Sequence, residues 1–194
     1  ILSEAFGRKL VILRRRVQHV AGNGAALDLA KVDERVVTTV AWHKLPLYGL
    51  ANLAGAYHSL LVVTVADSDA AASAADDGSS TWPSEYVIEK FQSRVYPKGV
   101  FVSDWRAVKD KISDEPLHQL STNDAGMVVK EGLTMKKLYE KAMEQEEYNV
   151  ADCNCHHMAK EVYNHCVHPK MPALRVSEIP NKWQTSMAKI AKNV

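Results

Sequence analysis

The pattern of hydrophobic and polar positions divides the chain into a strand-rich first half and a helix-rich second half. Apolar, β-branched runs of strand length are found at Arg8–Val17, Val36–Trp42, Tyr57–Ala66, Glu85–Phe91 and Gly99–Asp104. The run over Tyr57–Ala66 has a fully apolar centre, which predicts a strand buried on both faces. We expect Glu85–Phe91 to pair antiparallel to it.

Segments rich in small, polar, Gly or Pro residues separate these runs and predict connections. Ala21–Ala26 reads as a turn region, and Leu45–Ala56 as an irregular connection broken by Pro46, Gly49 and Gly55. The low-complexity segment Asp67–Ser80 predicts a surface loop between two strands.

Helical spacing governs the second half. Thr134 is an N-cap residue for a helix that ends near Gln145, and Tyr148-Asn149-Val150 reads as a short extended segment. Pro180 opens a final predicted helix. Because strands cluster early and helices late, the fold class is α+β, an antiparallel β-sheet packed against helices.

Another helix is predicted from Cys155 onward. Apolar residues recur after it at +3, +4, +7, +8 and +11, namely Met158, Ala159, Val162, Tyr163 and Cys166. Cys155 therefore lies in the first helical turn, preceded by Asn154. The partial positive charge of a helix N-terminus favours the thiolate, which is the reactive form of cysteine. The alternative is a buried core thiol without chemistry.

Length and composition fit one α+β domain over residues 1–194. Lys and Arg number 24 and Asp and Glu 23, without a basic block, which argues against a nucleic-acid partner. No apolar stretch approaches the ~20 residues of a transmembrane segment. The start at Ile1 leads us to expect a fragment of a longer polypeptide with other domains.

The cysteine pattern points to a reducing compartment such as the cytoplasm. The three cysteines all fall within residues 153–166, an odd number in a short stretch, which does not suit a disulfide framework. Nothing in the sequence implies a cofactor.

A cysteine nucleophile needs a base, and histidine suits that role near neutral pH. Of the eight histidines, His156 and His157 follow Cys155 directly and point away from it around the helix. His165 and His168 lie nearly three turns or more further on. His58 instead starts the strongest strand, from which its side chain can reach a helix packed on the sheet. The alternative for His58 is a structural hydrogen-bonding residue.

The chain order of "GAYHSLLVV", "EYVIEKF" and "YNVADCNCHHMAKEVYN" resembles the permuted branch of the papain-like (NlpC/P60) thiol hydrolase superfamily. This branch includes the lecithin:retinol acyltransferase-like proteins and the PPPDE peptidases. Asn154-Cys155 matches the family's Asn-Cys pair, His157 the histidine that follows it, Tyr148 the preceding tyrosine and His58 the base. The resemblance covers roughly residues 55–166 and leaves 1–50 and 170–194 as extensions.

Two positions depart from the family pattern. Met158 replaces the usual Phe, and Glu89 stands where the acyltransferase-like proteins have a second histidine that orients the first. A carboxylate can do the same work, because it fixes the imidazole tautomer and stabilises the imidazolium. Asp67 and Asp69 are alternatives for this third residue, and an exposed carboxylate paired with a lysine is the alternative interpretation of Glu89.

A zinc site is the competing interpretation of the Cys- and His-rich segment. If residues 155–166 form one helix, Cys155 and Cys166 are too far apart to share an ion. A site from Cys153, Cys155 and one histidine needs a fourth ligand from elsewhere. We therefore predict no metal.

The sequence predicts a cysteine-dependent hydrolase or acyl transferase that forms an acyl-Cys155 intermediate on an amide, thioester or ester. Its catalytic residues are Cys155, His58 and Glu89, with Asn154 and His157 beside the substrate or the oxyanion. The substrate is a protein or peptide, as for a protease or isopeptidase. The alternatives are an acyl-lipid substrate, as for a lipid acyltransferase or thioesterase of the same fold, and a catalytically inactive interaction domain.

Overall fold

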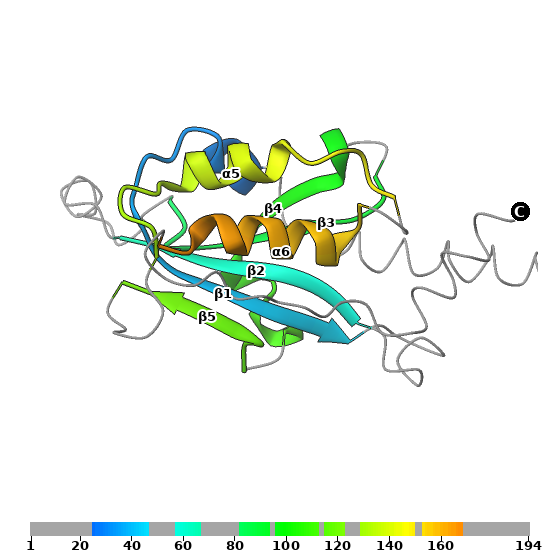
Figure 1. Ribbon diagram of the computed structural model, residues 1–194, viewed down its shortest axis with the longest axis horizontal. Coiled ribbons are helices and arrows are strands. Elements are labelled where there is room, and N and C mark those ends of the chain that lie inside the picture. The colour runs from blue at the N-terminus through cyan, green and yellow to red at the C-terminus, as the bar shows by residue number, and fades with distance from the viewer. Residues whose placement is uncertain are drawn as a thin grey trace, which may run out of the picture.

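A five-stranded antiparallel sheet forms the centre of the computed structural model, which describes residues 25–46, 57–66, 82–93, 96–112, 115–122, 129–149 and 153–168. The strands are β1 (Val37–Pro46), β2 (Tyr57–Val65), β3 (Glu85–Lys90), β4 (Val100–Asp104) and β5 (His118–Ser121). Their order across the sheet is β4-β3-β2-β1-β5, which makes β2 the central strand (Figure 1).

Helices cover one face of this sheet and short 3₁₀ turns cover the other. The helices are α2 (Ala25–Ala30), α5 (Met135–Met143) and α6 (Cys155–Cys166), and α6 crosses the sheet over β2 (Figure 1). The turns on that other face are η2 (Trp105–Ala107) and η3 (Lys109–Lys111), whereas η1 (Pro97–Gly99) lies beside the end of α5. An antiparallel sheet packed against helices confirms the predicted α+β class.

Side-chain alternation along β2 feeds two apolar clusters. Leu61 and Val63 point towards α6 and pack in the larger cluster with its buried residues, among them Met158 and Val162. Leu60 and Val62 point to the opposite face and pack in the smaller cluster under η2 and η3. The prediction that this strand is buried on both faces is confirmed.

Several predicted elements are confirmed with small shifts in their ends. β3 runs antiparallel to β2 as expected, and the predicted strand over Gly99–Asp104 is β4. Thr134 caps α5, where its hydroxyl accepts the N–H of Lys137 at 3.4 Å. The predicted Arg8–Val17 strand, the Asp67–Ser80 loop and the Pro180 helix lie outside the described residues.

Two sequence expectations need correction, and one strand is not predicted by the sequence pattern. β1 continues through Leu45 and Pro46, which the sequence pattern places in the irregular connection, because these residues pair with His58 and Tyr57. Ala25 and Ala26 begin helix α2 rather than a turn, since alanine favours helix and Ala26 packs inward. β5 was not foreseen: it is four residues long, and Leu120 is its one buried apolar side chain.

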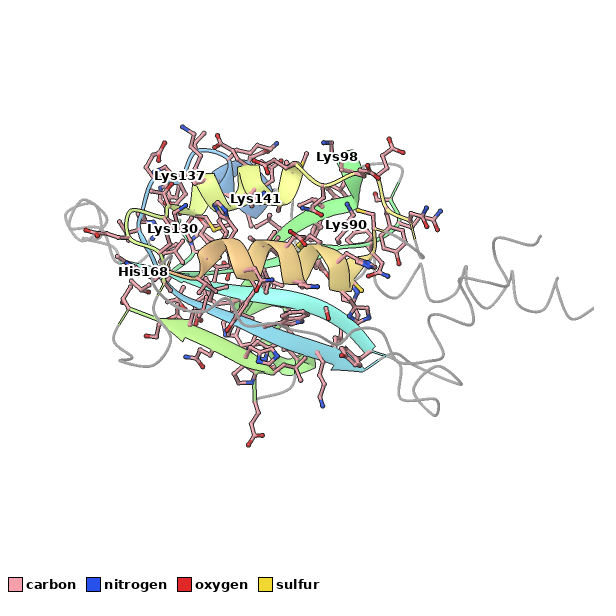
Figure 2. All side chains as sticks on the ribbon, viewed as in Figure 1. Lys90, Lys98, Lys130, Lys137, Lys141 and His168 are labelled. Atoms are coloured by element: carbon pink, nitrogen blue, oxygen red, sulfur yellow. The ribbon has the colours of Figure 1, made fainter. Side chains whose placement is uncertain are left out.

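Two lysines hold the end of α5 and the segment that leads to α6. Figure 2 shows Lys90 and Lys98 on the side of the molecule where α5 ends. Lys98 Nζ donates to the carbonyl of Met143 at 2.8 Å, and the buried Lys90 Nζ donates to the carbonyl of Glu146. Cations next to free carbonyls at a helix C-terminus are favourable.

None of the described helices is both long and apolar enough to cross a membrane.

We predict that Leu138→Ala destabilises the fold by about 2–5 kcal/mol, because it leaves a cavity in the larger apolar cluster, where α5 packs beside α6. Leu138 is fully buried in the larger cluster. Urea denaturation followed by circular dichroism measures the change. Glu140→Ala, at an exposed position of the same helix, is the control and should change stability by less than about 0.5 kcal/mol. Equal effects of the two substitutions would contradict the described packing of α5.

Candidate active site

Asn154 caps the helix that carries Cys155. Its side-chain oxygen accepts the N–H groups of His156 at 2.9 Å and of His157 at 3.3 Å. The backbone N–H of Asn154 in turn donates to Nδ1 of His157 at 3.4 Å, which completes a capping box. This cap leaves the N–H of Cys155 as the first-turn donor that Asn154 does not use. The structure thus places both Asn154 and His157 in the helix cap.

The structure brings Cys155, His58 and Glu89 together at this helix end. Nε2 of His58 lies 2.9 Å from Oε2 of Glu89, and both side chains are buried. The thiol of Cys155 is in hydrogen-bond contact with the His58 ring. Because Glu89 engages Nε2, Nδ1 is the ring nitrogen available to the sulfur. Asp67 and Asp69 lie outside the described residues.

The end of β3 explains how a thiol on one face of the sheet meets a ring on the other. His58 shares the face of Leu60, and Glu89 stands directly opposite Leu60, so both lie on the face away from α6. The β2–β3 ladder ends at this Leu60–Glu89 pair, whereas β2 begins three residues earlier, at Tyr57. Cys155 approaches β2 at its uncovered end and meets the ring there.

The backbone of β2 contributes a further contact with the sulfur. The backbone N–H of Val65 donates to the carbonyl of Ser84 at 3.0 Å, on the side of β2 that faces β3. Backbone N–H groups alternate in direction along a strand, so the N–H of every second residue back to Ser59 also points to the β3 side. Ser59 lies beyond the last pair with β3. Its N–H donates to the Cys155 sulfur instead, as does the N–H of His156.

These contacts reverse the usual proton distribution of the pair. Burial by itself raises the pKa of Cys155, but the His58 imidazolium and the N–H groups of Ser59 and His156 outweigh it, so the pKa is lowered. Burial by itself lowers the pKa of His58, but the charges and hydrogen bonds of Cys155 and Glu89 raise it to about 10. The arrangement therefore favours a thiolate–imidazolium pair at neutral pH.

Two tyrosines are close enough to Cys155 for its charge to act on them. Burial raises the pKa of Tyr148 and of Tyr57, and the negative charge of Cys155 raises both further, which locates the rings near the thiolate. The Tyr57 ring also packs edge-on against His156, with 5.0 Å between ring centroids. Cys155 itself is 6% exposed.

The other two cysteines lie in different surroundings. Cys166 belongs to the larger apolar cluster, as predicted, and burial raises its pKa. Cys153 is buried and bridges to Asn149, and its sulfur donates to the Glu146 carbonyl at 3.4 Å. Within the part of the chain that the structure describes, no group of three or more His, Cys, Asp or Glu side chains is placed to hold a metal ion.

Sequence reasoning missed a buried polar chain beside the thiol. Nε1 of Trp42 donates to Oγ of Ser59 at 3.0 Å, and this oxygen lies 2.6 Å from Nδ1 of His156. The one available signal was the polar Ser59 at a position that shares the face of Leu61 and Val63. The His156 ring faces Ser59.

Comparisons of the chain with protein-family models, with curated proteins and with solved structures found no match.

We predict that Cys155 is alkylated by iodoacetamide much faster than Cys153 or Cys166 at about pH 7. As the pH falls through the lowered pKa of Cys155, the thiolate takes up a proton and the rate drops. Above the His58 pKa of about 10 the thiolate remains, so alkylation persists. Mass spectrometry of each cysteine peptide from about pH 5 to about pH 11 measures this profile.

His58→Ala should move the Cys155 midpoint upward and slow its alkylation at about pH 7 by at least about tenfold, because the imidazolium is gone. His165→Ala, on the far half of α6, is the control and should leave the profile unchanged. Slow and equal labelling of all three thiols in the unsubstituted protein would contradict the ion pair.

Proposed function

We propose that this protein is a cysteine-dependent hydrolase or acyl transferase that works through an acyl-Cys155 intermediate. The observation that carries the proposal is the contact of the Cys155 thiol, at a capped helix N-terminus, with a histidine that Glu89 holds from behind. Nucleophile, base and orienting carboxylate are the three parts that acyl transfer by a thiol needs.

The proposed reaction begins with the Cys155 thiolate attacking the carbonyl carbon of the substrate. The oxyanion of the tetrahedral intermediate lies near the helix N-terminus, where the N–H of Cys155 is not used by the Asn154 cap. The His58 imidazolium then protonates the leaving group, and the acyl-sulfur bond remains. Neutral His58 next activates water or another nucleophile, which releases the acyl group and restores the thiolate.

The proposed fold relationship is to the permuted papain-like superfamily. Its support is the chain order of a histidine on a central strand, a carboxylate on the next strand and a cysteine at a helix start. The antiparallel sheet beneath α6 is compatible with this relationship.

We favour an amide or isopeptide bond as the substrate, as in a protease or isopeptidase. An amine leaves only after it receives a proton, whereas a thiolate leaves from a thioester without one. A ring whose pKa is raised to about 10 keeps that proton available at neutral pH. The Cys155–His58 pair also suits esters and thioesters, so the experiment compares different classes of acyl donor.

We predict that a matched panel of peptide amide, isopeptide, ester and thioester donors produces an acyl adduct on Cys155. Rapid quenching and intact-mass measurement detect the adduct, and peptide mapping locates it. Cys155→Ala should abolish it, and Cys153→Ala should not. If only the thioester and ester donors are turned over, the result would favour a lipid acyltransferase or thioesterase over a protease. If no donor produces an adduct, the proposed activity is wrong and the result favours a non-catalytic interaction domain.

Glu89→Gln should reduce the rate of amide turnover by about tenfold to a hundredfold. It should also move the alkaline limb of the plot of turnover rate against pH to lower pH. The isosteric amide keeps a hydrogen-bond partner for Nε2 but removes the charge that raises the His58 pKa. Glu85→Gln, on the same strand, is the matched control and should leave turnover within about twofold. An unchanged alkaline limb in Glu89→Gln would argue against Glu89 as the orienting residue.

A further inference from the structure

The two residues proposed to do the chemistry each have a neighbour in the chain, and those neighbours bind each other. Ser59 follows His58 on β2, and His156 follows Cys155 on α6. Ser59 Oγ and His156 Nδ1 lie 2.6 Å apart. One hydrogen bond therefore joins the strand that carries the base to the helix turn that carries the nucleophile.

Ser59 contacts the first turn of α6 at two points. Its backbone N–H donates to the Cys155 sulfur, and its side chain binds the next residue, His156. Two contacts from one residue fix both the distance and the rotation of the helix end relative to β2.

Trp42 on β1 fixes the orientation of the Ser59 hydroxyl. An indole N–H can only donate, so Ser59 Oγ accepts from it at 3.0 Å and has its own proton for His156 Nδ1. The Trp42 ring also packs against Tyr163 of α6, with 6.0 Å between centroids. The chain from Trp42 through Ser59 to His156 thus crosses β1, β2 and α6.

Burial argues against Ser59 and His156 acting as a second nucleophile and base. Ser59 is 0% exposed and His156 is 1% exposed, so no substrate carbonyl reaches the hydroxyl. A buried polar pair with no access to substrate acts on the site through geometry.

We propose that Ser59 and His156 are positioning residues, whose hydrogen bond holds β2 and the start of α6 at the spacing that brings the Cys155 sulfur onto the His58 ring. This inference rests on the proposed function. It assigns the two residues a role in the reactivity of Cys155 in addition to any contribution to stability.

The test measures the pH midpoint of Cys155 alkylation together with the melting temperature of each variant of the full chain. Ser59→Ala and His156→Leu remove the hydrogen bond, and each should raise the midpoint by about one pH unit and slow alkylation at about pH 7 about tenfold. His156→Asn places an amide oxygen near the position of Nδ1 and should keep the rate within about twofold of the unsubstituted protein.

Val162→Ala is the control for stability without the hydrogen bond. Val162 is buried on the same face of α6, two turns beyond Cys155, so its truncation should lower the melting temperature and leave the midpoint unchanged. If Ser59→Ala does not fold, the two His156 substitutions decide the question on their own.

Two results would overturn the inference while the proposed function stands. One is a Ser59→Ala or His156→Leu protein that melts earlier but keeps the original midpoint. The other is a His156→Asn protein shifted as far as His156→Leu. A Cys155 midpoint in the unsubstituted protein equal to that of Cys153 would instead overturn the proposed function itself.

Discussion

The ion pair between Cys155 and His58 lies where little water reaches it, and the rest of the site follows from that constraint. Removing a charge from water costs several kcal/mol unless partners replace the lost hydration, as a rough expectation for buried ions. Here the thiolate has the imidazolium and two backbone N–H groups, and the imidazolium has Glu89. The charge on Cys155 therefore depends on His58, and the charge on His58 depends on Cys155 and Glu89.

The sheet supplies these partners because β3 stops early. Where β3 ends at Lys90, the N–H of Ser59 on β2 has no pair in that strand and turns to the sulfur. The same ending lets a side chain from the α6 side meet one from the opposite face. Lys90, the last residue of β3, donates to the carbonyl of Glu146, which follows the end of α5.

Polar contacts and apolar packing act together along α6. Its N-terminal turn is tied by the Asn154 cap and by Ser59, and its remaining turns bury Met158, Val162 and Cys166 against the sheet. The apolar contacts set the direction in which α6 crosses β2. The polar contacts set the position of the helix along its axis, and its rotation, at the end that carries the thiol. This division explains how one face of α6 can carry both core residues and Cys155.

Local signals in the sequence were enough to predict most of the secondary structure and to single out Cys155 and His58, which the structure brings into contact. Alternation and apolar content identified β2, β3 and β4, and helical spacing with an N-cap residue identified α5 and α6. The Asn154-Cys155 helix start and a histidine on the central strand are also local features. β5 was missed because its one buried apolar residue leaves almost no pattern.

The sequence by itself determined that Cys155 begins a helix and that His58 and Glu89 sit on neighbouring strands. Only the tertiary structure decided that these three side chains meet, because their meeting depends on the register of β2 with β3 and on where α6 crosses the sheet. The Trp42–Ser59–His156 chain also belongs to the tertiary structure alone. Hydrogen bonds between residues 17 and 97 positions apart depend on strand pairing and helix packing, which no local pattern encodes.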